Sequence, residues 1–328
     1  FIRTNHQEAN RQLEAQTNLD YWNLSVYHLS LSDSRKLCYH GLMQTSIFQT
    51  DEWAQFKCKS GYADCYRIED ILVLEKRLPL GRSMLYSPMV NESQKRQVTS
   101  QKFLIEIKRL AQNTKTIFYR LEFNVPQNSF NLQLATCNFR KSFEEMQPEH
   151  TLVLDITPNE SEILAQMKQK GRYNIKIAEK SDLIYSWSNK PGVELDNFYS
   201  LYREMAQRQK ISCRDKLYFE TLLDILGQKS YARVYNATTK KEGNNGALAA
   251  AIVTYYGGRA TYLYGGSGSE MRNLMAPYGL HWQIIKDARG LACTNYDFFG
   301  IAPTDDEKHP WAGITRFKKQ FGGTEVDL

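Results

Sequence analysis

The spacing of apolar and polar residues predicts alternating helices and strands in the first part of the chain. Between 46 and 57, Trp53 and Phe56 are spaced to share one face of a helix, and Thr50 or Asp51 can cap its start. Further along, strand-like apolar runs alternate with an amphipathic segment. In chain order we expect strands over Arg67–Lys76 and Arg82–Val90, a helix over Gln94–Asn113 and a strand over Thr116–Val125.

A second unit of the same kind begins near His150. Its first helix carries start signals, since Thr157 is a candidate N-cap, Pro158 suits the first helical position and Glu160 follows three residues after the cap. The pattern predicts an α+β protein with a duplicated unit, divided into residues 1–149 and 150–328. The expected elements are a strand over Thr151–Ile156, a helix to about Lys180, helices over 196–209 and 215–228, strands over Tyr231–Asn236, Ala247–Tyr256 and Ala260–Gly265, a helix over Ala276–Arg289 and a strand over Tyr296–Gly300.

A glycine-rich segment, Gly265-Gly266-Ser267-Gly268, is predicted to form a turn before the helix that starts near Ala276. Helix N-termini bind anions and polarise carbonyls, so this turn could hold a phosphate or a reactive carbonyl. An ordinary hairpin or strand-to-helix turn is the alternative interpretation. The residues from Arg272 to Pro277 lack the glycines of a pyrophosphate loop, which argues against coenzyme A as a ligand.

A basic stripe is predicted on the helix that follows Pro158. Its members are four residues apart and therefore share one face. They could contact a phosphate backbone, or they could form a solvated surface, which is the simpler interpretation on the residues alone. The stripe consists of Lys168, Arg172, Lys176 and Lys180.

Lys318 is a candidate for chemistry because it lies between Phe317 and Phe321. A lysine among aromatic rings either extends over them to solvent or places its cation in a groove, where it could stabilise an oxyanion. The six histidines fall in no recognisable catalytic motif. If the chain is an enzyme, we expect it to work by positioning and electrostatics, without a covalent nucleophile.

Composition excludes several classes of function. The 328 residues carry 42 basic and 36 acidic side chains, a net charge of +6, and contain no apolar run long enough to span a membrane. The six cysteines form no CxxC pair, so we expect neither a zinc site nor a disulfide framework, and a reduced, cytoplasmic setting. No Walker A motif or metal-ligand cluster is present in the sequence.

Several segments, in their order and spacing, resemble the FemABX family of aminoacyltransferases, which build peptidoglycan cross-bridges. The similarity runs from about Ser46 to Gly323, and the pieces Arg272–Tyr278 (RNLMAPY) and Tyr296–Ile301 (YDFFGI) are especially typical of the family. The matching segments are Phe48–Lys57 (FQTDEWAQFK), Met167–Lys180 (MKQKGRYNIKIAEK), Tyr262–Ile301 and Phe317–Gly322 (FKKQFG).

The resemblance implies two GNAT-like domains and a transfer reaction without a cofactor. Family members move an amino acid from aminoacyl-tRNA, the co-substrate, to a side-chain amine of a peptidoglycan stem peptide, or to a bridge residue already attached there. The acceptor is lipid II or the soluble UDP-MurNAc-pentapeptide. For this chain the resemblance implies a monomer in the cytoplasm, in peripheral contact with the inner face of the membrane.

The resemblance also implies roles for individual residues. In family members a lysine of the first domain and an arginine of the second bind the nucleotide diphosphate, and these positions match Lys57 and Arg214. Tyrosines lining the same groove match Tyr218 and Tyr264, and an acidic position near the acceptor matches Glu122, a candidate general base.

At the reacting carbonyl, the resemblance matches Lys318, after Phe317, with the lysine that stabilises the tetrahedral intermediate. It also changes the interpretation of the basic residues, which are now expected to face tRNA. These candidates are Lys168, Arg172, Lys176, Lys180, Arg316 and Lys319.

The chain departs from the family in three places. The stretch from Lys180 to Asn197 is too short for the long coiled-coil arm of many members, and Gly171 stands where others usually have threonine. The chain also stops short of the C-terminal segment that returns to the first domain, so that domain is expected to be incomplete. Three alternatives stay open: a coenzyme A-dependent GNAT acetyltransferase, an aminoacyl-tRNA transferase acting on a protein or small-molecule amine, and a non-catalytic protein that binds tRNA or lipid II.

Overall fold

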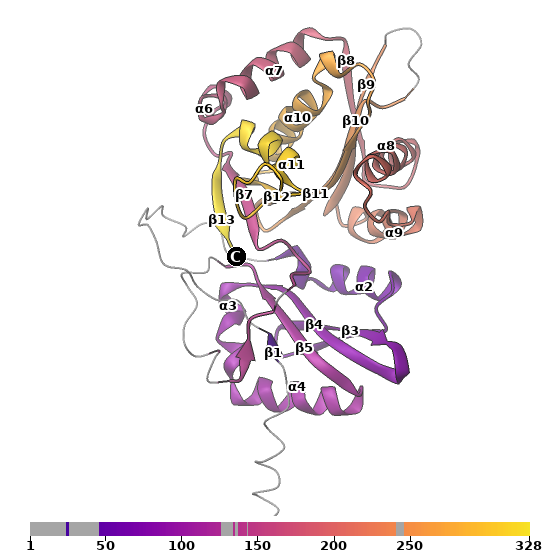
Figure 1. Ribbon diagram of the computed structural model, residues 1–328, viewed down its shortest axis with the longest axis vertical. Helices are drawn as coiled ribbons and strands as arrows, with labels where there is room; N and C mark the ends of the chain where they lie inside the picture. The colour runs from indigo at the N-terminus through magenta and orange to yellow at the C-terminus, as the bar shows by residue number, and fades with distance from the viewer. Residues whose placement is uncertain (1–23, 26–45, 126–133, 135–136, 143, 241–245) are drawn as a thin grey trace, which may run out of the picture.

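The computed structural model describes residues 24–25, 46–125, 134, 137–142, 144–240 and 246–328. Helices pack on two mixed β-sheets that lie one above the other in Figure 1. The first sheet has the strand order β2-β3-β4-β5-β1-β6, and the second has the order β13-β7-β12-β11-β10-β9-β8. The predicted α+β class is confirmed.

The first sheet and its helices come from residues 24 to 140. The strands are β1 (Leu24–Ser25), β2 (Asp64–Ile68), β3 (Ile71–Leu78), β4 (Arg82–Val90), β5 (Thr116–Phe123) and β6 (Phe139–Arg140). The helical segments are η1 (Ile47–Gln49), α2 (Asp51–Lys59), η2 (Pro79–Gly81), α3 (Glu92–Lys95), η3 (Gln97–Thr99) and α4 (Gln101–Asn113).

The second sheet and its helices come from residues 150 to 327. The strands are β7 (His150–Asp155), β8 (Leu183–Ser188), β9 (Ala232–Thr239), β10 (Ala249–Tyr256), β11 (Arg259–Ser267), β12 (Asn295–Gly300) and β13 (Thr324–Asp327). The helical segments are α6 (Glu160–Gln166), α7 (Gln169–Lys180), α8 (Val193–Gln209), α9 (Lys216–Leu222), η5 (Leu223–Gly227), η6 (Arg272–Leu274), α10 (Ala276–Gly290), α11 (Ala312–Lys318) and η7 (Lys319–Phe321).

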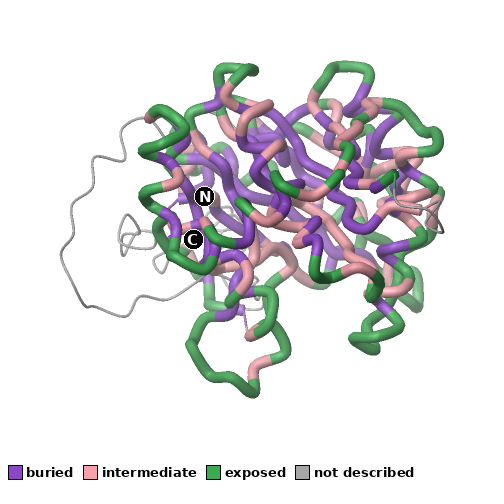
Figure 2. The backbone as a smooth tube through the Cα atoms, turned by 90° about the horizontal axis from the view of Figure 1, so that it is seen from above, coloured by how far each residue is buried: buried purple, intermediate pink, exposed green. Residues whose placement is uncertain are grey.

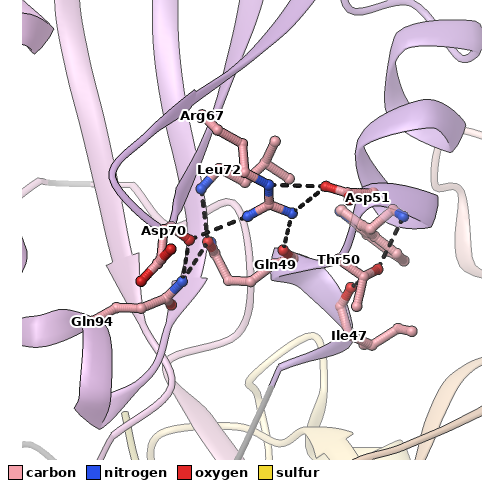
Figure 3. Close-up of polar contacts among 9 residues, drawn as sticks. Ile47, Gln49, Thr50, Asp51, Arg67, Asp70, Leu72 and Gln94 are labelled. Carbon is pink, nitrogen blue, oxygen red and sulfur yellow. Dashed lines mark hydrogen bonds and ion pairs between the residues drawn. The ribbon is translucent and has the colours of Figure 1, made fainter.

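The start of α2 is held in place from two sides. The Thr50 hydroxyl accepts a hydrogen bond from the backbone N–H of Trp53, which confirms Thr50 as the N-cap. The Arg67 guanidinium, from β2, donates to the Asp51 carboxylate at 2.6 and 2.9 Å and to the Gln49 carbonyl at 2.7 Å (Figure 3). These bonds fix the direction in which α2 leaves the sheet.

Two predictions for the first sheet need correction. Arg67–Lys76 is a hairpin and not one strand, because the chain reverses between β2 and β3 at Glu69, whose φ is +52°. Gln94–Asn113 is also not one helix. A short helix capped by Asn91 comes first, and α4 starts only at Gln101, where the Ser100 hydroxyl accepts from the Phe103 N–H.

The first helix of the second sheet also differs from the prediction. Thr157 is not its N-cap; Asn159 caps α6 and forms a capping box with Glu162. The helix does not run on to Lys180, because an extended backbone at Met167 and Lys168 separates α6 from α7. The strand β8 follows α7 almost at once, so no long coiled-coil arm is inserted there.

The glycine-rich segment is not a turn before a helix. Gly265 and Gly266 lie inside β11, where they pair with Ala251 and Ala250 of β10. A Cβ atom on Gly266 would lie 2.9 Å from the backbone carbonyl of Leu201 in α8. The glycine is therefore needed where α8 approaches the strand closely, and not for a phosphate-binding loop.

We expect Gly266→Ala to lower the free energy of unfolding by about 1–3 kcal/mol, because the added methyl group overlaps the α8 backbone. Thermal unfolding followed by circular dichroism measures this change. Gly268→Ala is the matched control, since its Cβ would lie at ordinary contact distances, no closer than 3.4 Å, from the side chains of Leu201 and Glu204 and the backbone of Glu270. Equal unfolding temperatures for the two variants would contradict the close-approach explanation.

One apolar cluster joins the two sheets. It contains Trp53 and Phe56 of α2 together with Phe219 of α9 and Leu226 of η5, all buried. Across it, the Phe56 ring meets the Tyr218 ring edge to face at a centroid distance of 4.9 Å. Figure 2 shows this buried interior running through the body of the molecule, with exposed residues in the outer loops.

Candidate functional site

A cluster of cations and tyrosines lies between α2 and α9, which we call the cation–tyrosine cluster. Its members are Lys57, Tyr62, Arg214, Tyr218 and Tyr264. The Lys57 ammonium lies 5.4 Å from the centre of the Tyr218 ring and 5.1 Å from that of Tyr62. The Arg214 guanidinium lies 4.5 Å from the centre of the Tyr218 ring, and the hydroxyls of Tyr218 and Tyr264 are 3.1 Å apart.

Each member of the cluster is positioned by its own element. Lys57 is in the last turn of α2, Tyr218 is in the first turn of α9, and Arg214 lies just before that helix. Tyr264 comes from β11 and packs its ring against Phe219 at 5.2 Å. The structure thus brings together all four residues that were predicted to bind the acceptor.

The charge state of Lys57 depends on the other cations near it. Burial, the Arg214 charge and the Lys76 charge together lower the pKa of Lys57 to about 8. In the part of the chain that the structure describes, neither Lys57 nor Arg214 forms an ion pair. A bound phosphate would relieve the repulsion between two cations held this close together, so the arrangement is chemically suited to a dianion.

Tyr62 and Lys76 belong to this region but were not predicted from the sequence. Tyr62 follows the end of α2, and its backbone N–H donates to the Lys57 carbonyl at 3.1 Å. Lys76 is on β3, which reaches α2 only through the fold of the sheet. No motif in the sequence marks Tyr62 as a neighbour of the Lys57 side chain, and the approach of Lys76 depends on the tertiary structure.

Lys318 lies in a second, buried cluster at the end of α11. Only 6% of the residue is exposed. Its ammonium donates to the Gly300 carbonyl at 2.6 Å and lies 5.5 Å from the centre of the Tyr262 ring. Burial lowers the pKa of Lys318 to about 7, against a smaller opposing effect of the Asp297 carboxylate. The lysine is therefore close to the balance between its charged and neutral forms at neutral pH.

Aromatic rings enclose the Lys318 cluster. Phe317 packs against Tyr278 and Phe321 at centroid distances of 5.0 and 5.4 Å, and against the ring of His281 at 5.5 Å. Burial and the neighbouring Lys318 charge lower the pKa of His281 to about 3, so this imidazole is neutral. Lys318 is thus largely shielded from water, which strengthens the electrostatic effect of its charge on nearby groups.

A β-bulge in β11 separates the two clusters. The pairing with β10 shifts between Ile252 and Val253, so that Tyr264 pairs with Ile252 and Tyr262 with Val253. As a result Tyr264 packs on the side of α9, while Tyr262 packs on the side of α10 against His281. One strand thus contributes a tyrosine to each cluster, on opposite faces of the sheet.

Glu122 is part of neither cluster by direct contact. It is buried on β5, and its carboxylate accepts hydrogen bonds from the Tyr86 hydroxyl and from the backbone N–H groups of Met146 and Gln147, the latter two at 2.6 and 3.2 Å. Burial raises its pKa, although these bonds act in the opposite direction. The contacts show that Glu122 anchors the segment leading into β7, and a general-base role stays a prediction.

The six residues expected to face tRNA divide into two groups. Lys176 and Lys180 are exposed on α7, and Arg172 donates to the Met167 carbonyl beside the break between α6 and α7. Lys168, Arg316 and Lys319 line a pocket of about 160 Å³ together with Asp305, Asp306 and Glu307. Because Lys319 is ion-paired with Asp305 and Glu325, at 2.8 and 2.7 Å, it is less available to a phosphate than the α7 lysines.

The sequence model of the FemAB family matches residues 127–236 and 229–327. The chain belongs to the FemAB family. Among curated proteins, it is similar to the lipid II:glycine glycyltransferase of Staphylococcus aureus, with 21% identity over 243 residues. The match covers 55% of this chain, which spans 57% of the length of that relative.

Solved structures show the FemAB fold over more of the chain. A crystal structure of FemX, 18% identical, has a TM-score of 0.72 and covers 86% of this chain and 90% of that one. The C-terminal domain of a putative lysylphosphatidylglycerol synthetase from Agrobacterium fabrum, 9% identical, has a TM-score of 0.53 over 85% of this chain and 86% of that one. These likenesses support the predicted pair of GNAT-like sheets.

In this FemAB chain, the described residues hold no group of three or more His, Cys, Asp or Glu side chains arranged for a metal ion. Among the described helices, none combines the length and the apolar character needed to cross a bilayer.

Proposed function

We propose that this FemAB chain transfers an amino acid from aminoacyl-tRNA to the side-chain amine of a peptidoglycan precursor. The observation that carries the proposal is the cation–tyrosine cluster, in which the Lys57 and Arg214 cations both lie against the Tyr218 ring. Such a cluster suits the diphosphate that both lipid II and UDP-MurNAc-pentapeptide contain. The name of the staphylococcal relative supports an acceptor of this class.

The proposed reaction is aminolysis of an ester. The neutral amine of the stem peptide attacks the aminoacyl carbonyl, the new C–N bond forms, and a tetrahedral oxyanion results. When the oxyanion collapses, the C–O bond to the tRNA 3′ end breaks, and the ribose oxygen takes up the proton that the amine loses. Aminoacyl esters are reactive already, so alignment and charge stabilisation are the main tasks of the protein.

Lys318 is the proposed source of positive charge at the oxyanion. Its ammonium holds the Gly300 carbonyl with one N–H and retains two further donors for a substrate. The Gly300 bond and the Tyr262 ring fix its position before substrate arrives, so little reorganisation is needed during the reaction. Phe317 supports this arrangement by packing its ring against the His281 ring of the Lys318 cluster.

Mass spectrometry of muropeptides tests the proposal directly. The protein is incubated with mixed aminoacyl-tRNAs and, in separate reactions, with lipid II or UDP-MurNAc-pentapeptide. We expect one precursor to gain the mass of one amino-acid residue on its stem peptide. No gain with either acceptor would contradict the proposal, and acetylation in a parallel reaction with acetyl-coenzyme A would favour the acetyltransferase alternative.

The affinity for the diphosphate should depend on pH because of Lys57. Its pKa is about 8, and only the protonated form attracts a phosphate strongly, so affinity should fall as pH rises from 7.5 to 9.5. Calorimetric titration with UDP-MurNAc-pentapeptide over this range measures the fall. Lys57→Arg is the matched control, because arginine keeps its charge and should give a nearly constant affinity. A fall of the same size in both proteins would exclude Lys57 as the cause.

A further inference from the structure

The turn between β3 and β4 presents an unusual apolar side chain. Leu80, at the centre of η2, is 97% exposed and has a φ of +61°. A non-glycine residue in the left-handed region is conformationally unfavourable, and here the side chain is not compensated by packing. Pro79 restricts the backbone before Leu80, and Gly81, with a φ of +67°, completes the tight turn.

Basic residues surround this turn. Lys76 and Arg77 precede it and Arg82 follows it, and all three are exposed. Over the ranges that the structure describes, none of the three is ion-paired. The acidic neighbour Glu75 accepts a hydrogen bond from the Tyr66 hydroxyl at 2.8 Å and so points away along the sheet. The turn is therefore an apolar tip beside three exposed cations on the adjoining strand ends.

The turn lies on the same side of the molecule as the cation–tyrosine cluster. Lys76 is near enough to Lys57 for its charge to affect that lysine, as Arg214 does from the second sheet. In Figure 1 the end of α2, the β3–β4 end of the first sheet and α9 all face the same side. Two further apolar residues near Arg214 are well exposed, Ile211 at 50% and Leu217 at 69%.

We propose that the β3–β4 turn docks the protein on the surface of an anionic lipid bilayer. Leu80 enters the interfacial region of the bilayer, and Lys76, Arg77 and Arg82 lie at the level of the lipid phosphates. An apolar insertion together with a cluster of cations is the combination that gives reversible binding to a negatively charged leaflet. Either alone would bind weakly.

Docking in this orientation has a consequence for the substrate. It places Lys57 and Arg214 close to the headgroup plane, where the diphosphate of a lipid-linked precursor would lie. This step rests on the proposed function, because it assumes that the cation–tyrosine cluster binds a diphosphate. The docking surface itself does not depend on that assumption.

Sedimentation with lipid vesicles tests the docking surface. The full chain is mixed with vesicles of phosphatidylcholine alone or with about one third phosphatidylglycerol, at low and high salt. We expect binding to the anionic vesicles that weakens with salt. Leu80→Glu should reduce partitioning about ten-fold or more, and Lys76→Ala about five-fold, as expected for one cation near an anionic surface.

Controls use matched residues on other surfaces. Leu291→Glu changes another exposed leucine, at the end of α10, and should bind like the wild type. If the wild type does not bind anionic vesicles, or if Leu80→Glu binds no more weakly than Leu291→Glu, the docking proposal is wrong. Leu80→Ser replaces Leu80→Glu if the latter alters thermal unfolding. A change in sedimentation of the protein without lipid would indicate that Leu80 meets a second copy of the chain, which would also overturn the proposal.

Transfer assays keep this proposal separate from the proposed function. Leu80→Glu should reduce transfer to lipid II in vesicles but leave transfer to soluble UDP-MurNAc-pentapeptide unchanged. If the wild type binds vesicles through Leu80 but modifies neither acceptor, the docking surface stands and the proposed function fails. If the wild type modifies an acceptor but does not bind vesicles, the proposed function stands and the docking surface fails.

Discussion

Replacing Lys318 with methionine should lower the turnover number for aminoacyl transfer by about 10²–10³-fold, the usual effect of removing a group that stabilises an oxyanion. Methionine has a similar length and suits the aromatic surroundings of the Lys318 cluster, so mainly the charge is lost. A transfer assay with radiolabelled aminoacyl-tRNA measures the change. Binding of the acceptor should change little, because Lys318 lies on the opposite face of β11 from Tyr264.

Lys319→Met is the matched control for this experiment. Lys319 is the next residue in the chain and makes ion pairs with Asp305 and Glu325, whose carboxylates are exposed although the lysine side chain is mostly covered. Solvent around the two carboxylates weakens these pairs, so the control should fold and retain most of its turnover. Equal turnover of Lys318→Met and wild type would exclude the oxyanion role.

The pH dependence of stability separates a catalytic defect of Lys318→Met from unfolding. The pKa of Lys318 is about 7 in the folded protein and 10.5 when unperturbed. Between these values the unfolded chain holds a proton that the folded chain has released, so Lys318 makes the free energy of unfolding rise with pH over this window. The methionine variant should show a smaller rise. At pH 6, where the wild type carries a buried charge, the variant should unfold at no lower temperature.

Replacing Arg214 with alanine should weaken binding of the acceptor about 10–100-fold, as expected for losing charge-assisted hydrogen bonds to a phosphate. The same change at Lys57 should have an effect of similar size, since both cations lie against the Tyr218 ring. Calorimetry with UDP-MurNAc-pentapeptide and vesicle titration with lipid II measure the affinity. Both acceptors are measured because a loss of affinity would be hard to detect with a precursor that the wild type binds only weakly.

Two matched variants sharpen this test. Lys59→Ala removes an exposed lysine two residues beyond Lys57 in the same helix and should leave affinity for the soluble precursor unchanged. Arg214→Lys keeps the charge but loses the planar group over Tyr218, so its affinity should fall between those of alanine and wild type. If Arg214→Ala binds both acceptors as tightly as the wild type, the cation–tyrosine cluster is not the diphosphate site.

Local signals in the sequence predicted some elements well. The strand over Arg82–Val90 has the predicted bounds, and Thr50 caps α2 as expected, because these features depend on neighbouring residues only. The start of α6 was misplaced because Thr157, Pro158 and Asn159 all carry helix-start chemistry. The structure shows that only Asn159 forms the capping bonds.

The errors and omissions arise where distant segments meet. The glycines of β11 have the composition of a turn. Gly266 is needed instead because the backbone of α8, some sixty residues earlier in the chain, leaves no room for a Cβ atom. Lys76 comes near the cation–tyrosine cluster only because the β2–β3 hairpin folds against α2. Tyr62 reaches Lys57 through the turn that ends α2. The roles of Lys57 and Arg214 came from family resemblance, since no spacing in the sequence links them. The aromatic neighbours of Lys318 already suggested an oxyanion role, which the resemblance then favoured.

The apolar cluster between the sheets has a consequence for how the protein unfolds. The helices that pack on the two sheets bury each other's side chains here, Trp53 and Phe56 of α2 against Phe219 of α9 and Leu226 of η5. Neither half of the protein therefore keeps a complete core without the other. Calorimetry should therefore show one cooperative transition for both sheets. A ligand held between Lys57 and Arg214 would raise the temperature of that whole transition, because it binds only when the two halves are assembled.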